Sequence, residues 1–284
     1  AVKILMNSFY GVLGANGCRF HDARLASSIT LRGHEIIQRS REQIEAHGYK
    51  VIYGDTDSLF VLLGPGYQTP QARAIGTRLA RALNDWWRQT LARELSLHSH
   101  LEIEFETHFA RFLMPTVRGE QTGSKKRYAG LVREGNEERL VFKGLESVRT
   151  DWTPLAREFQ RELYRRIFNS EPYEQFIQQT LERMLSGELD HALVYSKRLR
   201  RRVQDYSRNV PPHVQAARKL GIPVKWVRYI ITSNGPEPIR EGLPLPRPDY
   251  EHYRDRQLAP AADGILHFLD SSFDAITDAQ MSMF

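Results

Sequence analysis

Two aspartates, Asp55 and Asp57, stand one residue apart in a short polar stretch between two apolar runs. In extended backbone the side chains at i and i+2 point the same way, so both carboxylates can reach one small volume. Two anions that close repel each other unless a cation lies between them, and oxygen ligands favour a hard ion such as Mg²⁺. The pair therefore indicates a divalent-metal site. The alternative is an ordinary hairpin turn, where Asp, Thr, Ser and Gly are common.

A second candidate group lies at the start of the chain, where Lys3, Asn7 and Tyr10 follow helical spacing at i, i+4 and i+7. A cationic Lys and an amide Asn on one helix face suit a triphosphate, and Tyr offers a flat face to a base pair. A surface lysine on an amphipathic helix is the alternative for Lys3 alone.

Periodicity predicts the elements that position these residues. Residues 2–13 favour a helix, Asp22 caps a second helix that Gly48 ends, and residues 71–95 form a third. Strands over 49–53 and 59–63 enclose the aspartate turn. The apolar positions of the first helix should face a core; they are Leu5, Phe9, Val12 and Leu13. The apolar positions of the second helix include Leu25, Ile29, Ile36, Ile37 and Ile44.

Residues 101–106 alternate apolar and acidic side chains, which predicts a half-buried strand with Glu102, Glu104 and Glu106 on one face. A solvent-facing sheet edge is an equally good interpretation of those three acids. Further strands are expected at 127–132 and 139–143. The pattern up to residue 150 is thus a mixed sheet-and-helix half.

Helices dominate after Asp151. Thr153 and Pro154 form an N-cap and N1 pair, and further helices are expected over 172–185 and 210–220. A strand over 224–232 precedes a Pro-rich loop from 235 to 248 and two short helices. The predicted fold class is α+β, with an antiparallel sheet and packed helices followed by a mostly helical half.

The composition excludes several protein classes. The chain has 284 residues, enough for roughly two domains. Its single cysteine, Cys18, excludes an intrachain disulfide and a zinc-finger cluster, and suits the reducing cytoplasm. The apolar run 59–63 is far shorter than the roughly 20 residues of a membrane helix, so no membrane association is expected. Residues 1–6 lack an initiator methionine and a signal peptide, which predicts a piece of a longer protein.

The charge is unevenly distributed along the chain. Residues 111–149 carry 9 basic and 5 acidic residues, residues 153–234 carry 15 and 8, and residues 249–284 carry 2 and 7. A single charged run is usually a solvated helix face. A basic band of about 120 residues, with a cluster at 197–202, instead indicates a polyanion lying across it.

The hexapeptide at 53–58, Tyr-Gly-Asp-Thr-Asp-Ser, resembles motif C of the bacterial family B DNA polymerases. The nonapeptide at 3–11 resembles their fingers motif B, and both occur in the family's order. The resemblance implies three parts: the end of the fingers (1–15), a palm (16–150) and a thumb with a C-terminal tail (151–284). It implies that dNTPs are added to a primer 3′-OH by two-metal phosphoryl transfer with two Mg²⁺ ions.

The same resemblance assigns roles within the catalytic region. Asp55 and Asp57 are the catalytic carboxylates, and Asp57 is the direct metal ligand. Residues 101–106 resemble the palm strand beside motif C, with Glu104 and Glu106 nearest the metals. Lys3, Asn7 and Tyr10 are the nucleotide-binding residues.

Three further elements imply contacts with primer–template DNA. Residues 125–128 resemble the family's K-K-x-Y element, and 143–151 resemble its K-G-x-E-x-x-R-x-D element, except that Thr150 stands where the family often has a second Arg. Residues 212–217 match the thumb pattern. The implied DNA-binding residues are Lys125, Lys126, Arg127, Tyr128, Lys143, Arg149 and Lys197.

The last five residues resemble the peptide with which bacterial polymerases bind the sliding clamp, with Gln280, Met283 and Phe284 as the contacts. Its expected form is a disordered tail that fills an apolar pocket. A frayed terminus without function is the alternative. The resemblance also implies a monomeric, nucleoid-associated protein.

No D-x-x-S-L-Y-P string, the family's motif A, occurs in the chain, and neither do the exonuclease carboxylates. The chain alone is therefore expected to be inactive in synthesis. The alternative function is a non-catalytic, clamp-tethered DNA-binding module. Another palm-fold catalyst, such as a reverse transcriptase or a nucleotide cyclase, would have a different turn sequence and would lack motif B.

Overall fold

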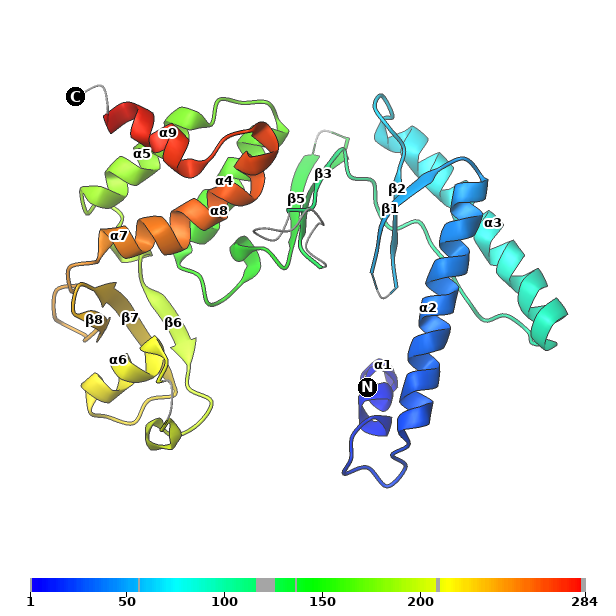
Figure 1. The fold of residues 1–284 in the computed structure, drawn as a ribbon, viewed down its shortest axis with the longest axis horizontal. Helices are drawn as coiled ribbons and strands as arrows, with labels where there is room; N and C mark the ends of the chain where they lie inside the picture. Colours follow the sequence, from blue (N-terminus) through cyan, green and yellow to red (C-terminus); the bar gives the residue numbers. More distant parts are fainter. Residues whose placement is uncertain (1, 56, 116–125, 136, 208–209, 282–284) are drawn as a thin grey trace. The chain divides into compact units, whose positions relative to one another are not determined.

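The computed structural model describes residues 2–55, 57–115, 126–135, 137–207 and 210–281. The chain forms two compact units, Ala1–His108 and Phe109–Phe284 (Figure 1). Each unit combines helices with small antiparallel sheets, so the predicted α+β class is confirmed. Among the described residues, no helix is both long enough and apolar enough to span a membrane.

The described residues of the first unit form three helices and one hairpin: α1 (Val2–Leu13), α2 (Ala23–Ala46), β1 (Lys50–Gly54), β2 (Leu59–Leu62) and α3 (Thr69–Leu95). Asp22 caps α2 by accepting a hydrogen bond from the Arg24 amide at 2.9 Å, as the sequence predicted. Gly48 has φ +85°, a left-handed conformation that glycine adopts without strain, and it turns the chain from α2 into β1.

Helices α2 and α3 are joined by one buried polar contact and one surface ion pair. The indole Nε1 of Trp87, which is almost fully buried, donates to Ser40 Oγ at 2.8 Å. The Arg39 guanidinium donates two hydrogen bonds of 2.9 Å to the Glu94 carboxylate, which lowers the pKa of Glu94 to about 2. These contacts make the helix pair the support on which the hairpin packs.

Two apolar positions that were expected to face a core are exposed. Phe9 and Val12 on α1 lie largely in solvent, so that prediction was wrong for these two, and Leu25 and Ile29 on α2 are exposed as well. Helical periodicity identifies a face that needs a partner, but not the segment that supplies it. Within the first unit, no described element covers these side chains.

The second unit begins with the sheet β3-β4-β5, followed by a set of packed helices (Figure 1). Thr153 caps α4 as predicted, accepting from the Ala156 amide. The bounds are β3 (Arg111–Leu113), β4 (Tyr128–Glu134), β5 (Glu137–Lys143), the 3₁₀ turn η1 (Glu146–Val148), α4 (Pro154–Phe168), α5 (Glu174–Leu185), η2 (Asp190–Ala192), α7 (Tyr250–Tyr253), the π-helical segment η4 (Arg254–Leu258), α8 (Ala259–Leu266), η5 (His267–Leu269) and α9 (Phe273–Met281).

A second antiparallel sheet lies within the helical half, in the order β6-β7-β8. Its strands are β6 (Tyr195–Arg198), β7 (Trp226–Thr232) and β8 (Gly235–Pro238), and between β6 and β7 lie η3 (Val203–Asp205) and α6 (Pro212–Leu220). Only β7 was predicted. The sequence around β6 was interpreted as a basic cluster, and the two prolines of β8 suggested a loop, although prolines are tolerated at a sheet edge.

Candidate functional site

The two strands that the sequence predicted on either side of the aspartates pair as an antiparallel hairpin. Its closing pair is Asp55 and Ser58, with the Asp55 amide donating to the Ser58 carbonyl oxygen at 2.9 Å. Below that pair, Gly54 faces Leu59 and Tyr53 faces Phe60 across the strands. The rings of Tyr53 and Phe60 are 5.3 Å apart between centroids. The polar tip of the hairpin therefore follows directly on a pair of contacting aromatic rings.

The root of the hairpin is fixed in a small core. Val51 is buried with Ile44 of α2 and Leu83 of α3. At Gly54, a Cβ would lie 3.3 Å from Leu59 Cδ2 and 3.6 Å from Ile37 Cγ2, so α2 approaches the hairpin closely there. An added Cβ at Gly54 would therefore be tight against the Leu59 side chain and in ordinary van der Waals contact with α2.

The two carboxylates differ in exposure. Asp57 lies in the loop and is exposed, and the Ser58 hydroxyl donates to its Oδ1 at 3.3 Å. Asp55, at the end of the strand, is half-buried. Because an exposed carboxylate is the more accessible ligand, Asp57 is the better placed of the two to meet a metal ion.

Residues 101–106 are not a strand, so that prediction was wrong, although their alternation in burial is confirmed. The backbone of Ile103 pairs with a side chain of α3 instead: Asn84 Nδ2 donates to the Ile103 carbonyl at 2.8 Å, and the Ile103 amide donates to Asn84 Oδ1 at 2.9 Å. Phe105 lies on Gly76, where a Cβ would overlap its ring. The segment is thus bound along α3 rather than hydrogen-bonded to a neighbouring strand.

Glu102, Glu104 and Glu106 lie on the exposed side of this bound segment. Ile103, which points the other way, packs against the core at the root of the hairpin. The acids and the hairpin therefore belong to one region of the first unit. Yet no three His, Cys, Asp or Glu residues of the described ranges come close enough to hold a metal ion.

Helix α1 contains the three candidate nucleotide-binding residues. Tyr10 is exposed, and its hydroxyl is 2.8 Å from Thr30 Oγ1 of α2. Lys3 and Asn7 lie within the helix, but their side chains are outside the described part of the structure. The Thr30 contact, which the sequence did not predict, holds the Tyr10 ring beside α2.

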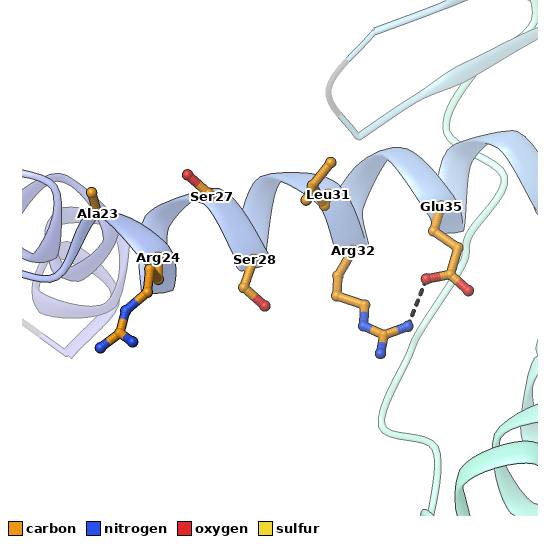
Figure 2. Close-up of a pocket in the computed structure, with 7 residues that line it drawn as sticks. All are labelled: Ala23, Arg24, Ser27, Ser28, Leu31, Arg32 and Glu35. Carbon is orange, nitrogen blue, oxygen red and sulfur yellow. Dashed lines mark hydrogen bonds and ion pairs between the residues drawn. The ribbon is translucent and has the colours of Figure 1, made fainter.

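A shallow hollow runs along the first half of α2 (Figure 2). The side chains of Arg24, Ser28 and Arg32 point to one side of the helix, as Figure 2 shows. Arg24 pairs with Asp22 at 2.7 Å, and Arg32 pairs with Glu35 at 2.6 Å. Since both cations are neutralised locally, we assign this hollow no function.

In the second unit, the candidate DNA-binding residues cluster around the β4–β5 pair. Tyr128 and Lys143 are cross-strand partners, and Lys143 Nζ lies 5.9 Å from the centre of the Tyr128 ring. Gly144 has φ +65°, and a Cβ there would collide with the Lys126 carbonyl oxygen. Glycine is thus required where the K-G turn meets the K-K-x-Y element. Lys125 lies outside the described residues.

Arg127 has a structural partner that the sequence did not indicate. Its guanidinium pairs with Glu146, whose side chain is 8% exposed against 31% for Arg127. Gln160 of α4 is buried and donates to Glu146 Oε2 at 2.8 Å, and its Oε1 accepts from the Ser147 amide at 2.7 Å. Arg127 is therefore held inward, and it anchors the K-K-x-Y element to α4.

Arg149 and Lys197 both lie near Asp151. Arg149 donates to Asp151 from Nε at 3.0 Å and from Nη2 at 2.6 Å, and this hydrogen bonding, with the charge of Arg149 and of Lys197, holds the pKa of Asp151 below its ordinary range. Lys197 is half-buried on β6. The two cations thus flank one carboxylate at the start of the helical half.

This lowered pKa predicts a pH dependence. A depressed folded-state pKa stabilises the fold at pH values above the unfolded-state pKa of about 3.9. This stabilisation is lost as the pH falls below that value and through the folded-state pKa. Wild type should therefore exceed Asp151→Asn in stability at pH 7, and the difference should shrink below about pH 4. Urea unfolding across this range measures it, with the exposed Asp205→Asn as the control. A difference that does not shrink at all as the pH falls below about 4 would contradict the assignment.

The candidate clamp-binding residues follow a packed helix. In α9, Phe273 is fully buried, and Gln178 Nε2 donates to the Ile276 carbonyl at 3.0 Å. Gln280 lies in the last turn of α9, so the expected disordered tail does not begin before it. Met283 and Phe284 are outside the described residues.

Comparison with known proteins decides between the classes of palm-fold catalyst. The family model described as DNA polymerase family B matches residues 1–222. The chain belongs to DNA polymerase family B.

Two polymerases of family B illustrate the relationship. DNA polymerase II of Escherichia coli (strain K12) is 54% identical over 297 aligned positions, covering 100% of this chain and 37% of the relative. DNA polymerase 1 of Pyrococcus abyssi (strain GE5 / Orsay) is 30% identical, covering 94% and 34%. The resemblance to bacterial family B polymerases, and among them to DNA polymerase II, is thereby confirmed. The chain spans only about a third of the length of these relatives.

A solved structure of the same family agrees with the fold. The family B DNA polymerase from the hyperthermophilic archaeon Pyrobaculum calidifontis matches with a TM-score of 0.58 and 26% identity, over 93% of this chain and 32% of that one. The arrangement of helices and small antiparallel sheets described above is therefore that of a family B polymerase segment.

Proposed function

We propose that the chain is the palm-and-thumb portion of a DNA-directed DNA polymerase, which adds dNTPs to a primer 3′-OH. The observation that supports this most is the hairpin, because in this family B chain Asp57 is exposed at the tip and Asp55 directly follows strand β1. In this proposal residues 1–15 end the fingers, residues 16–150 form the palm, and residues 151–284 form the thumb and tail.

The candidate ligands are carboxylates, which is the ligand type that magnesium prefers. Mg²⁺ prefers carboxylate oxygens and keeps several waters, so one or two carboxylates suffice to hold it beside a substrate phosphate. Asp57 would be the direct ligand, Asp55 a support, and Glu104 and Glu106 the nearest further acids. Two bound Mg²⁺ ions would supply stabilisation of the attacking and leaving oxygens in phosphoryl transfer.

The other residues bind and orient the substrates. Lys3 and Asn7, one turn apart on α1, would contact the dNTP phosphates, and the Tyr10 ring would lie against the nascent base pair. The Thr30 contact restrains that ring. Because α1 and the hairpin belong to one unit, nucleotide and metal would meet on a single scaffold.

Primer–template duplex would lie on the basic residues of the second unit. Lys126, Lys143, Arg149 and Lys197, with Lys125, would contact phosphates without reading sequence. Arg127 would act indirectly, since its pairing with Glu146 directs it inward. The C-terminal residues Gln280, Met283 and Phe284 would bind the sliding clamp, and the protein would act as a monomer.

Duplex binding by the chain tests this part of the proposal. The double variant Lys143→Ala/Lys197→Ala should weaken binding of a primer–template duplex and lower the slope of log K against log salt by about 1.8, or about 0.9 per phosphate contact. Fluorescence anisotropy between 50 and 200 mM NaCl measures both. The matched control Lys50→Ala removes an exposed cation from β1 and should leave the slope unchanged. An unaltered slope in the double variant would contradict the proposal.

A further inference from the structure

The outer face of the β6–β7 pair is exposed at one end. Antiparallel register places Arg198 opposite Trp226 and Ser196 opposite Arg228. All four side chains are exposed, and Trp226 has 60% of its surface in solvent. Side chains that face each other across a sheet lie about 5 Å apart, so the indole is flanked by two guanidinium groups on one surface.

This surface is distinct from the one that contains Lys197. Strand side chains alternate between faces, and Lys197 shares its face with Tyr195, Val227 and Tyr229, all three of which are buried in the core. Arg198 and Trp226 point to the opposite side. The proposed duplex contact at Lys197 therefore leaves the outer face unassigned.

The outer face also has uncompensated positive charge. Arg200, two residues beyond Arg198, is exposed as well. None of the ion pairs within the described residues involves Arg198, Arg200 or Arg228, whereas Arg165, Arg166 and Arg183 elsewhere in the same unit are each paired with a glutamate. Unpaired cations around an exposed aromatic ring favour a polyanion that also has flat apolar groups.

We propose that Arg198, Trp226 and Arg228, with Arg200, form a binding site for single-stranded DNA. The cations attract the phosphates, and the indole stacks on an unpaired base, which is the usual combination in proteins that bind single strands. A duplex keeps its bases stacked on one another and would use only the cations. Trp226 therefore gives the site its preference for an unpaired strand.

Anisotropy of a labelled 12-nucleotide single strand and of the matching duplex, with the full 284-residue chain, tests the proposal. Trp226→Ala should weaken single-strand binding by about five- to a hundredfold. It should change duplex binding by less than about twofold, and Trp226→Phe should restore most of the loss. Arg198→Ala/Arg228→Ala should lower the single-strand salt slope by about 1.4.

The control Arg88→Ala/Arg183→Ala removes the same charge from residues that are paired with acids and should leave both affinities unchanged.

Trp226 is the most exposed of the four tryptophans, so its fluorescence should be quenched by the single strand in wild type and the quenching should be lost in Trp226→Phe. Equal losses of single-strand and duplex affinity in Trp226→Ala, or no loss at all, would overturn the proposal. A protein partner that binds this surface and is not displaced by the single strand would overturn it as well.

Discussion

Asp57→Asn is expected to lower primer extension by about a thousandfold in a chimeric polymerase, in which this chain replaces the matched part of E. coli DNA polymerase II. Asparagine keeps the size of the side chain but removes the charge that would neutralise a metal ion, and a thousandfold loss corresponds to about 4 kcal/mol of transition-state stabilisation. Because Asp57 is exposed at the hairpin tip, the substitution should leave folding intact. Single-turnover extension of a labelled primer measures the rate.

The matched control is Asp85→Asn, which removes an exposed carboxylate from α3, where it pairs only with Arg88 at 2.8 Å. This variant should extend primers within about twofold of the chimera, since surface ion pairs contribute little. Both variants should bind duplex DNA normally. A chimera with Asp57→Asn that extends primers at the unsubstituted rate would show that the carboxylate is not a metal ligand.

Glu146→Ala is expected to destabilise the second unit by about 2–4 kcal/mol. The change leaves the partly buried Arg127 without its anion and removes the acceptor for Gln160 Nε2. Losing one member of a buried, charged hydrogen-bond network costs several kcal/mol, and the partial exposure of Arg127 reduces that figure. Urea unfolding followed by circular dichroism at 222 nm gives the difference in unfolding free energy.

Glu138→Ala is the control, because Glu138 also pairs with an arginine, Arg133, but both side chains are more than 40% exposed. It should cost no more than about 1 kcal/mol. Glu146→Gln should recover part of the stability by keeping an acceptor for Gln160. Equal losses in the two alanine variants would contradict the structural role of the Arg127–Glu146 pair.

The hairpin could be predicted from the sequence because its signals are local. Apolar strands that flank a short polar turn define both the register and the tip, so the exposed Asp57 and the Tyr53–Phe60 pair follow from adjacent residues. The caps of α2 and α4 at Asp22 and Thr153 were predictable for the same reason.

The misses come from partners that are distant in the sequence. Residues 101–106 alternate as a strand does, but Asn84, on a helix 19 positions away from Ile103, takes the hydrogen bonds that a neighbouring strand would have supplied. The pairing of Arg127 with Glu146, 19 positions away, was likewise not indicated by the residues next to either of them.

The most direct measurement of the central claim compares primer extension by this chain alone with extension by the chimera, using the same radiolabelled duplex, dNTPs and Mg²⁺. We expect no templated synthesis from the chain, which contains Asp55 and Asp57 but no motif A string, and efficient synthesis from the chimera. A folded chimera that binds duplex DNA but extends nothing would contradict the polymerase assignment, and efficient synthesis by the chain alone would contradict the proposal that it supplies only part of the metal site.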